Sequence, residues 1–197
     1  CVTANVCTLD AADSKAATRV GRAGGLAISG RSAVLERQFF EKGHLVGIQE
    51  SRVQGSVART GQHFRMFASS ATAKGTLGVQ CWVSHCTSDF VLYSQSVSPR
   101  LMAVVLGFPC FHYEKKTQDQ WARPITLAVL VAHAPISSAP PDEKGAFYDS
   151  LVGVHSKLST KHGKSLRVLV LGDFNAKLGS LLSTGVGPVG AEDENES

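Results

Sequence analysis

The stretch Leu169–Ala176, which reads LVLGDFNA, constrains this chain more than any other segment. An apolar run from Val168 to Leu171 is typical of a buried strand, and it stops at Gly172. Asp173 and Asn175 follow directly, and both carry oxygen atoms suited to metal or phosphate chemistry. Because α/β proteins hold ligands at the carboxyl ends of their strands, the pattern predicts a site at this point.

Length and composition indicate one globular domain. The 197 residues can bury one sizeable core, and 43% hydrophobic with 18% charged residues is ordinary for a soluble protein. The net charge of +4 permits a polyanionic partner without requiring one. No apolar run reaches the roughly 18 residues of a membrane helix, so we expect no membrane partner. Five cysteines without a CxxC pair, mostly in apolar context, indicate reduced, buried thiols in an intracellular protein, the nucleus included.

Strand patterns dominate the chain. Residues 1–9, 44–48 and 124–132 predict strands, the last two buried like the run before Gly172. Between them the apolar period drops to two, which predicts an antiparallel run. Its four strands are expected at His63–Ala68, Leu77–Ser84, Phe90–Ser96 and Leu101–Phe108. Residues 10–30, 109–123 and 177–197 lack such patterns and are expected to be loops.

Two helices complete the pattern. Ser32 is a plausible N-cap for a helix over 33–42, whose inward residues would be Val34, Leu35 and Phe39. A second helix begins near Asp142 and ends at Gly163. Its inward face is expected to hold Phe147, Leu151, Val154 and Leu158. The element order predicts one α/β domain over 1–176, with mixed sheets and helices on the outer faces.

Polar residues follow four of the predicted strands. Asn5, Glu50, His133 and Asp173 each come after an apolar run, with Asn175 two residues beyond. Each alone is more often a turn or solvated residue, but the repetition indicates convergence at one sheet edge. Carboxylates and amides are hard oxygen ligands that suit Mg²⁺ or Mn²⁺ better than zinc. With a histidine beside them, the set suits hydrolysis of a phosphate ester.

Three segments resemble the signature motifs of the endonuclease/exonuclease/phosphatase superfamily: Gly47–Arg52 (GIQESR), Ala132–Pro135 (AHAP) and Gly172–Ala176 (GDFNA). Thr3–Leu9 is similar to the first strand of that family, and Ser98–Met102 resembles a middle strand of the non-LTR retrotransposon endonucleases. The resemblance implies a four-layer α/β/β/α sandwich with two mixed, mainly antiparallel sheets. It also implies divalent-metal-dependent phosphodiester hydrolysis, most particularly by the DNA endonuclease of a mobile element.

The resemblance implies a role for each site residue. Asn5 and Glu50 would hold Mg²⁺ or Mn²⁺, and Asp173 would orient the attacking water. Asn175 would hold the scissile phosphate. His133 stands where other members carry tyrosine or histidine. The expected partner is nucleic acid, DNA in particular.

The sequence also departs from the family pattern. Members close with a Ser-Asp-His segment that carries the central acid/base histidine, whereas no histidine follows His162 here. We therefore expect a domain truncated at its C-terminal end, and residues 1–197 to be inactive or nearly so. Arg52 and Arg100 are candidate phosphate contacts, although each reads equally well as a solvated arginine.

Three alternatives to a DNA endonuclease stay open. The chain could be a non-catalytic or degenerate nucleic-acid-binding remnant, or a phosphatase of the same superfamily acting on a small phosphoester. Residues 25–32 nearly match the phosphate-binding loop of nucleotide triphosphatases, but Arg31 replaces its lysine and no apolar strand precedes Gly25.

Overall fold

The structure is a computed structural model that describes residues 1–6, 31–56, 58–109 and 124–175. Its elements run in the order β1 (Val2–Asn5), α2 (Arg31–Phe40), β2 (Leu45–Gln49), β3 (Ala58–Thr60), β4 (Phe64–Ala68), β5 (Gln80–Ser84), α3 (His85–Ser88), β6 (Val91–Ser98), β7 (Leu101–Phe108), β8 (Ile125–His133), α4 (Pro141–His162), a 3₁₀ turn (Gly163–Ser165) and β9 (Leu166–Asp173).

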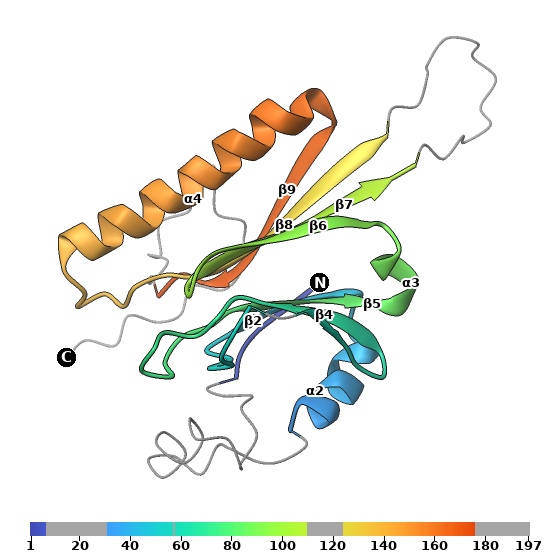
Figure 1. The fold of residues 1–197 in the computed structure, drawn as a ribbon, viewed down its shortest axis with the longest axis horizontal. Coiled ribbons are helices and arrows are strands. Elements are labelled where there is room, and N and C mark those ends of the chain that lie inside the picture. The colour runs from blue at the N-terminus through green and yellow to red at the C-terminus, as the bar shows by residue number, and fades with distance from the viewer. Residues whose placement is uncertain (7–30, 57, 110–123, 176–197) are drawn as a thin grey trace, which may run out of the picture.

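Two mixed sheets pack face to face. Among the described residues the first sheet has the strand order β1-β2-β5-β4-β3 and the second has β6-β7-β8-β9. The β1–β2 and β8–β9 pairs are parallel, and the other pairs are antiparallel. Helix α4 covers the outer face of the second sheet and α2 that of the first (Figure 1). The molecule is therefore the four-layer α/β/β/α sandwich that the motifs predicted.

Period-two alternation divides the strand residues among three apolar layers. Between the sheets lie Leu45, Val79, Cys81, Val104, Val129, Val131 and Leu171, with others of the same kind. On the α4 side, Phe147, Val154 and Leu158 are buried against the second sheet, as the helical spacing predicted. On the α2 side, the rings of Phe39 and Trp82 meet edge to face at 6.1 Å.

The first helix differs from its prediction. It begins at Arg31, so Ser32 lies inside it rather than capping it. Val34 is 57% exposed, and the buried positions are Glu36 and Phe39. Glu36 is buried because its carboxylate accepts the backbone N–H of His63 at 2.9 Å. A local hydrophobic pattern could not reveal this polar anchor.

The strand predictions need three corrections. β3 was not predicted, since its three residues are exposed and show no apolar pattern. The predicted strand Leu77–Ser84 begins only at Gln80, because Leu77 and Gly78 adopt left-handed backbone angles. Residues 168–171 form a strand, but it is an edge strand among the described residues: of these four only Leu171 is buried, and Val170 is 39% exposed. The predicted loops at 10–30 and 177–197, and most of 109–123, lie outside the described residues.

The cysteines share no common environment. Cys81 is buried between the sheets, and this burial raises the pKa of its thiol to about 12. Of the three cysteines that the structure describes, Cys1 and Cys86 are exposed, so among these three the predicted burial holds for Cys81 alone. Hydrogen bonds from Ser84 and Thr87 lower the pKa of the Cys86 thiol. Separately, none of the described helices has the length and apolar character to cross a membrane.

Candidate active site

The segment after β2 positions Glu50 through an unusual backbone. Glu50 and Arg52 have left-handed φ angles of 53° and 56°. The N–H groups of Ser51 and Arg52 donate to the carbonyls of Gly78 at 2.9 Å and Leu77 at 2.8 Å. Leu77 and Gly78 are left-handed as well, at 64° and 89°. The segments 50–52 and 77–78 are thus hydrogen-bonded to each other, and this contact fixes the backbone of Glu50.

The parallel pair β8–β9 positions His133 and Asp173. These two residues are partners in the register of the pair. The N–H of Ala134 donates to the carbonyl of Asp173 at 2.9 Å and keeps the strand ends together. Gly172 precedes Asp173 at a point where any Cβ would overlap the carbonyl oxygen of Ala132. A glycine is therefore required for the two strand ends to lie this close.

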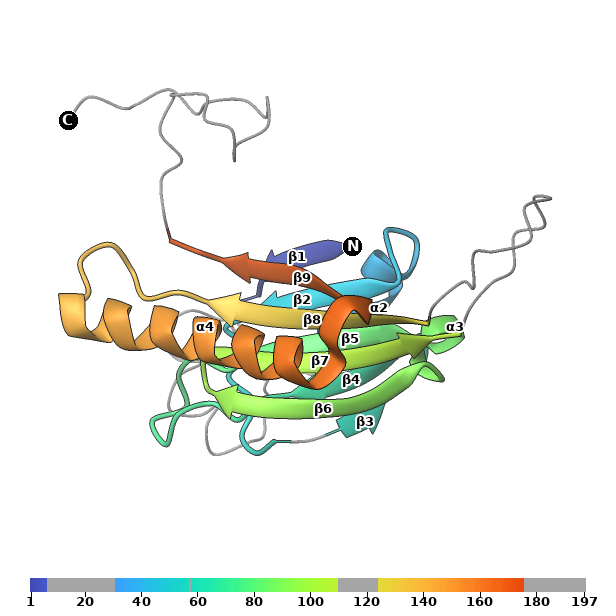
Figure 2. The same ribbon diagram turned by 90° about the horizontal axis from the view of Figure 1, so that it is seen from above.

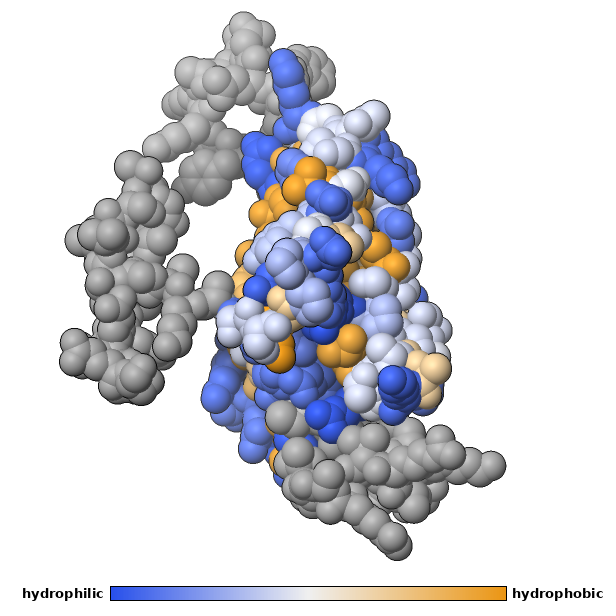
Figure 3. Space-filling model, turned by 90° about the vertical axis from the view of Figure 1, so that its left-hand side faces the viewer, coloured by the Kyte–Doolittle hydropathy of each residue, from blue (hydrophilic) through white to orange (hydrophobic). Residues whose placement is uncertain are grey.

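A close approach of the sheets brings β2 and β9 together. A Cβ on Gly47 would lie only 2.6 Å from Cβ of Leu171 and 3.5 Å from a methyl carbon of Val131. The strands β1, β2, β8 and β9 also run toward the same end of the sandwich (Figure 2). Hydrophilic side chains make up much of the described surface at that end, with separate hydrophobic patches (Figure 3). Four strand ends therefore meet there.

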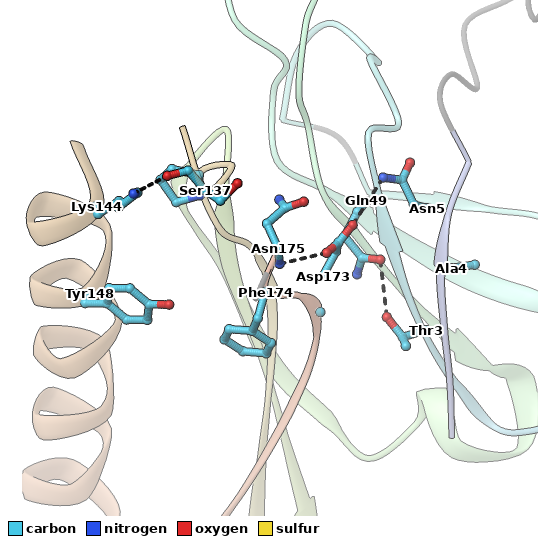
Figure 4. Close-up of a pocket in the computed structure, with 12 residues that line it drawn as sticks. Thr3, Ala4, Asn5, Gln49, Ser137, Lys144, Tyr148, Asp173, Phe174 and Asn175 are labelled. Atoms are coloured by element: carbon cyan, nitrogen blue, oxygen red, sulfur yellow. Dashed lines mark hydrogen bonds between the residues drawn. The ribbon is translucent and has the colours of Figure 1, made fainter. Parts of the chain in front are cut away.

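The structure brings together four of the predicted site residues, with the amide of Asn5 between two carboxylates and His133 beside one of them. Its Nδ2 donates to Glu50 Oε1 at 3.1 Å and lies 3.5 Å from Asp173 Oδ2. On the other side of Glu50, His133 Nε2 lies 3.8 Å from the same Oε1 atom. Figure 4 shows Asn5 and Asp173 facing each other from β1 and β9. The carboxylates thus converge on one point from two sheets.

His133 is buried, and the charges around it shift its pKa in opposite directions. Burial lowers the pKa of its imidazole; the charge of Arg100 adds to this, while Glu50 and Asp173 oppose it. The ring is therefore mainly neutral at pH 7. In the part of the chain that the structure describes, its Nδ1 is buried without a hydrogen-bond partner. The other ring nitrogen faces the carboxylates.

Asn175 adopts a tight turn after β9. Its φ is 47°, and its N–H donates to Asp173 Oδ1 at 2.9 Å, which is an Asx-turn bond. Its side-chain Nδ2 donates to the carbonyl of Ala134 at 2.7 Å. The turn interpretation is thus correct, and it is compatible with a site, because Asp173 Oδ2 still faces Asn5.

The two candidate arginines make internal contacts. Arg52 pairs with Glu50 at 3.2 Å. Arg100 donates to the carbonyls of His133 and Ala134, both at 3.4 Å, and pairs with Glu143 at 2.9 Å. Neither lines the cavity described next. Phosphate binding by either arginine stays a prediction.

An open cavity of about 920 Å³ adjoins the convergent residues. It runs from β1 to the first turns of α4. Its lining includes predicted residues and others that sequence reasoning missed; the missed ones include Thr3, Gln49, Ser137, Lys144 and Tyr148. The signal for Lys144 and Tyr148 was their spacing of four on a helix that starts just after the His133 strand, which places both on one side of its first turns.

The donor set fits a hard divalent cation. Glu50 and Asp173 offer carboxylate oxygens, and Asn5 carries an amide oxygen beside the nitrogen on which they converge. Mg²⁺ is commonly held by one or two carboxylates with water completing its shell. No cluster of three His, Cys, Asp or Glu suited to a metal occurs within residues 1–6, 31–56, 58–109 and 124–175. Oxygen donors of this kind suit Mg²⁺ or Mn²⁺ better than zinc.

Solved structures share this architecture. The catalytic domain of Xenopus laevis APE2 superposes with a TM-score of 0.55 at 16% identity, covering 89% of this chain and 58% of that one. The AP endonuclease LMAP from Leishmania major gives 0.55 at 12% identity, covering 87% and 53%. The chain thus spans less than two thirds of the length of either protein. No protein-family model and no curated protein matches the sequence.

These likenesses define the fold. The chain has the sandwich fold of the endonuclease/exonuclease/phosphatase superfamily, as its motifs predicted. Among solved structures it resembles those of AP endonuclease type.

Proposed function

We propose that this chain carries the metal site of a phosphodiesterase that acts on nucleic acid: Glu50 and the amide oxygen of Asn5 would hold Mg²⁺ or Mn²⁺, and Asp173 would orient the attacking water. One observation carries the proposal: two carboxylates from different sheets lie within 3.1 and 3.5 Å of one amide nitrogen. The amide donates to both carboxylates, and a cation held there would offset the repulsion between their charges. The ion would neutralise the phosphate and polarise it toward attack.

The two oxygens of Asp173 have separate tasks. Oδ1 accepts the N–H of Asn175, which fixes the rotation of the carboxylate. Oδ2, on the side of Asn5, can then accept a hydrogen bond from a water and orient it for attack. Positioning of this kind needs a rigid carboxylate, and the turn at Asn175 supplies it.

His133 would stabilise charge that develops on the phosphate. Its imidazole is mainly neutral, because burial lowers its pKa. A neutral ring carries one N–H, and a proton on Nε2 would lie on the side of Glu50, whose Oε1 atom is 3.8 Å from Nε2. A fixed donor aimed at developing negative charge is an effective form of transition-state stabilisation. Asn175 would add an amide contact to the scissile phosphate.

DNA is the substrate that we propose. The Leishmania protein of similar fold is named an AP endonuclease, and the net charge of +4 is compatible with a polyanion. The likeness of Ser98–Met102 to the retrotransposon branch makes the endonuclease of a mobile element the more particular proposal.

The test compares the 197-residue chain with Asp173→Asn. Asparagine keeps an oxygen for the N–H of Asn175 but removes the negative charge. We expect Mn²⁺ binding measured by calorimetry to weaken, because a negative charge beside the ion is lost, and Mg²⁺-dependent nicking of supercoiled plasmid, where the unaltered chain shows any, to fall on the order of 10²- to 10⁴-fold. The control is Asp89→Asn, an exposed carboxylate just past α3 at the opposite end of the sandwich.

Equal nicking by both proteins would contradict the proposal, as would a chain that binds no Mn²⁺. DNA binding without any cleavage or metal binding would instead favour the non-catalytic remnant.

A further inference from the structure

Helix α4 presents two side chains to the cavity beside the proposed site. Lys144 and Tyr148 lie one turn apart and both line this cavity, together with Asp173, Phe174 and Asn175. Figure 4 shows both side chains extending from α4 toward the segment that carries Phe174 and Asn175. No step of the proposed hydrolysis uses them. Their shared position therefore calls for a separate explanation.

Tyr148 is an anchored aromatic ring with an accessible surface. Its ring contacts that of Phe147 at 5.2 Å and an interplanar angle of 74°. Phe147 is buried in the layer between α4 and the second sheet. Tyr148 itself remains 45% exposed. A ring that is held on one side and open on another can stack with a planar ligand at small entropic cost.

Among the described residues that line this cavity, Lys144 is the one cation. Its Nζ donates to the carbonyl of Ser137, which takes one of its three N–H donors. The neighbouring carboxylate of Glu143 pairs with Arg100 at 2.9 Å. Since that pairing engages Glu143 elsewhere, the charge of Lys144 is available to an anionic ligand.

The cavity is also larger than a phosphate group requires. Its volume of about 920 Å³ lies in the range of pockets that hold whole small molecules, roughly 300–1,000 Å³. It combines the cation of Lys144, the rings of Tyr148 and Phe174, the carboxylate of Asp173 and several amide and hydroxyl groups. This combination matches a phosphate that carries a base.

We propose that Tyr148 and Lys144 form a subsite for an unpaired nucleotide next to the scissile phosphate, the base stacking on Tyr148 and the flanking phosphate pairing with Lys144. The inference rests on the proposed function for the position of the scissile phosphate. Bases inside a duplex have no free face for a side chain to stack on. The substrate class is therefore single-stranded or locally unpaired nucleic acid, rather than a regular duplex or a small phosphoester.

The test measures binding without hydrolysis. Two fluorescent ten-unit ligands with phosphorothioate linkages are compared by anisotropy: oligothymidine, and a chain of tetrahydrofuran abasic units with the same number of charges. Tyr148→Ala should weaken binding of oligothymidine about tenfold or more and leave the abasic chain nearly unaffected. Tyr148→Phe should retain the binding of both ligands.

Two further variants complete the set. Lys144→Gln should weaken both ligands alike and flatten the salt dependence, because it removes a phosphate contact. Val152→Ala changes a residue that is 62% exposed one turn further along α4 and does not line the cavity, so it should change neither ligand.

The inference is overturned if Tyr148→Ala weakens both ligands equally or neither, or if the unaltered chain binds neither ligand. Its failure differs from that of the proposed function. Mn²⁺ binding that Asp173→Asn weakens, with no base-selective effect of Tyr148→Ala, leaves the proposed function standing and removes the subsite. Base-selective binding by a chain that binds no Mn²⁺ leaves the subsite standing and removes the proposed function.

Discussion

At the scale of single residues, Glu50 depends on backbone strain. A non-glycine residue in the left-handed region costs about 1–2 kcal/mol, and Glu50, Arg52 and Leu77 all adopt it. The hydrogen bonds that the backbone of residues 51 and 52 donates to Leu77 and Gly78 compensate for this cost. The identity of Glu50 as a site residue was predictable, because it follows an apolar run. Its backbone angle was not, since a segment some 27 residues away imposes it.

Gly78 tests this dependence. It has φ 89°, and an added Cβ would lie 2.9 Å from Ser51 Oγ. We expect Gly78→Ala to lower the free energy of unfolding by about 1–3 kcal/mol. It should also weaken Mn²⁺ binding, because a shift of residues 77–78 would displace Glu50 through the hydrogen bonds between the two segments. Urea denaturation and calorimetry measure the two effects. Gly145→Ala, in a helix with open space around it, should not weaken metal binding; unchanged binding in Gly78→Ala would refute the dependence.

At the scale of elements, β9 shows what periodicity can and cannot reveal. The apolar run was correctly predicted as a strand, and Asp173 correctly placed at its end. Its apolar character on both faces predicted burial, yet within the described residues β9 pairs only with β8. Strand neighbours are set by contacts distant in sequence, so the run alone could not identify an edge. The same limit applies to α4: its inward face was predictable, while the neighbours of Lys144 and Tyr148 were not.

In the described part of the chain β9 is an edge strand, and an exposed apolar edge is prone to intermolecular pairing. Val170 is 39% exposed on β9. We expect Val170→Lys to reduce aggregation on mild heating, followed by light scattering, while the free energy of unfolding changes by about 0.5 kcal/mol or less. Leu171→Lys, at a position buried between the sheets, should unfold the protein. Undiminished aggregation of Val170→Lys would mean that the β9 edge is not the surface responsible.

At the scale of the whole molecule, the site exists because the two sheets approach closely at one point. Sequence motifs placed its four polar residues at strand ends, but β1 and β2 belong to one sheet and β8 and β9 to the other. Gly47 provides the approach, since a Cβ there would lie 2.6 Å from Cβ of Leu171. Its role as a spacer between sheets becomes visible only once both sheets are assembled.

Gly47 therefore links global stability to the site. Gly47→Ala should lower the free energy of unfolding by about 1–3 kcal/mol, as overpacked cores do, and weaken Mn²⁺ binding by moving Glu50 away from Asp173. Gly153→Ala, in α4 with nothing near its added methyl group, should instead stabilise by about 0.5–1 kcal/mol and leave Mn²⁺ binding unchanged. If Gly47→Ala loses stability but binds Mn²⁺ as before, the carboxylates do not depend on the sheet spacing. Because the two substitutions add the same methyl group, the difference between them isolates the contact between the sheets.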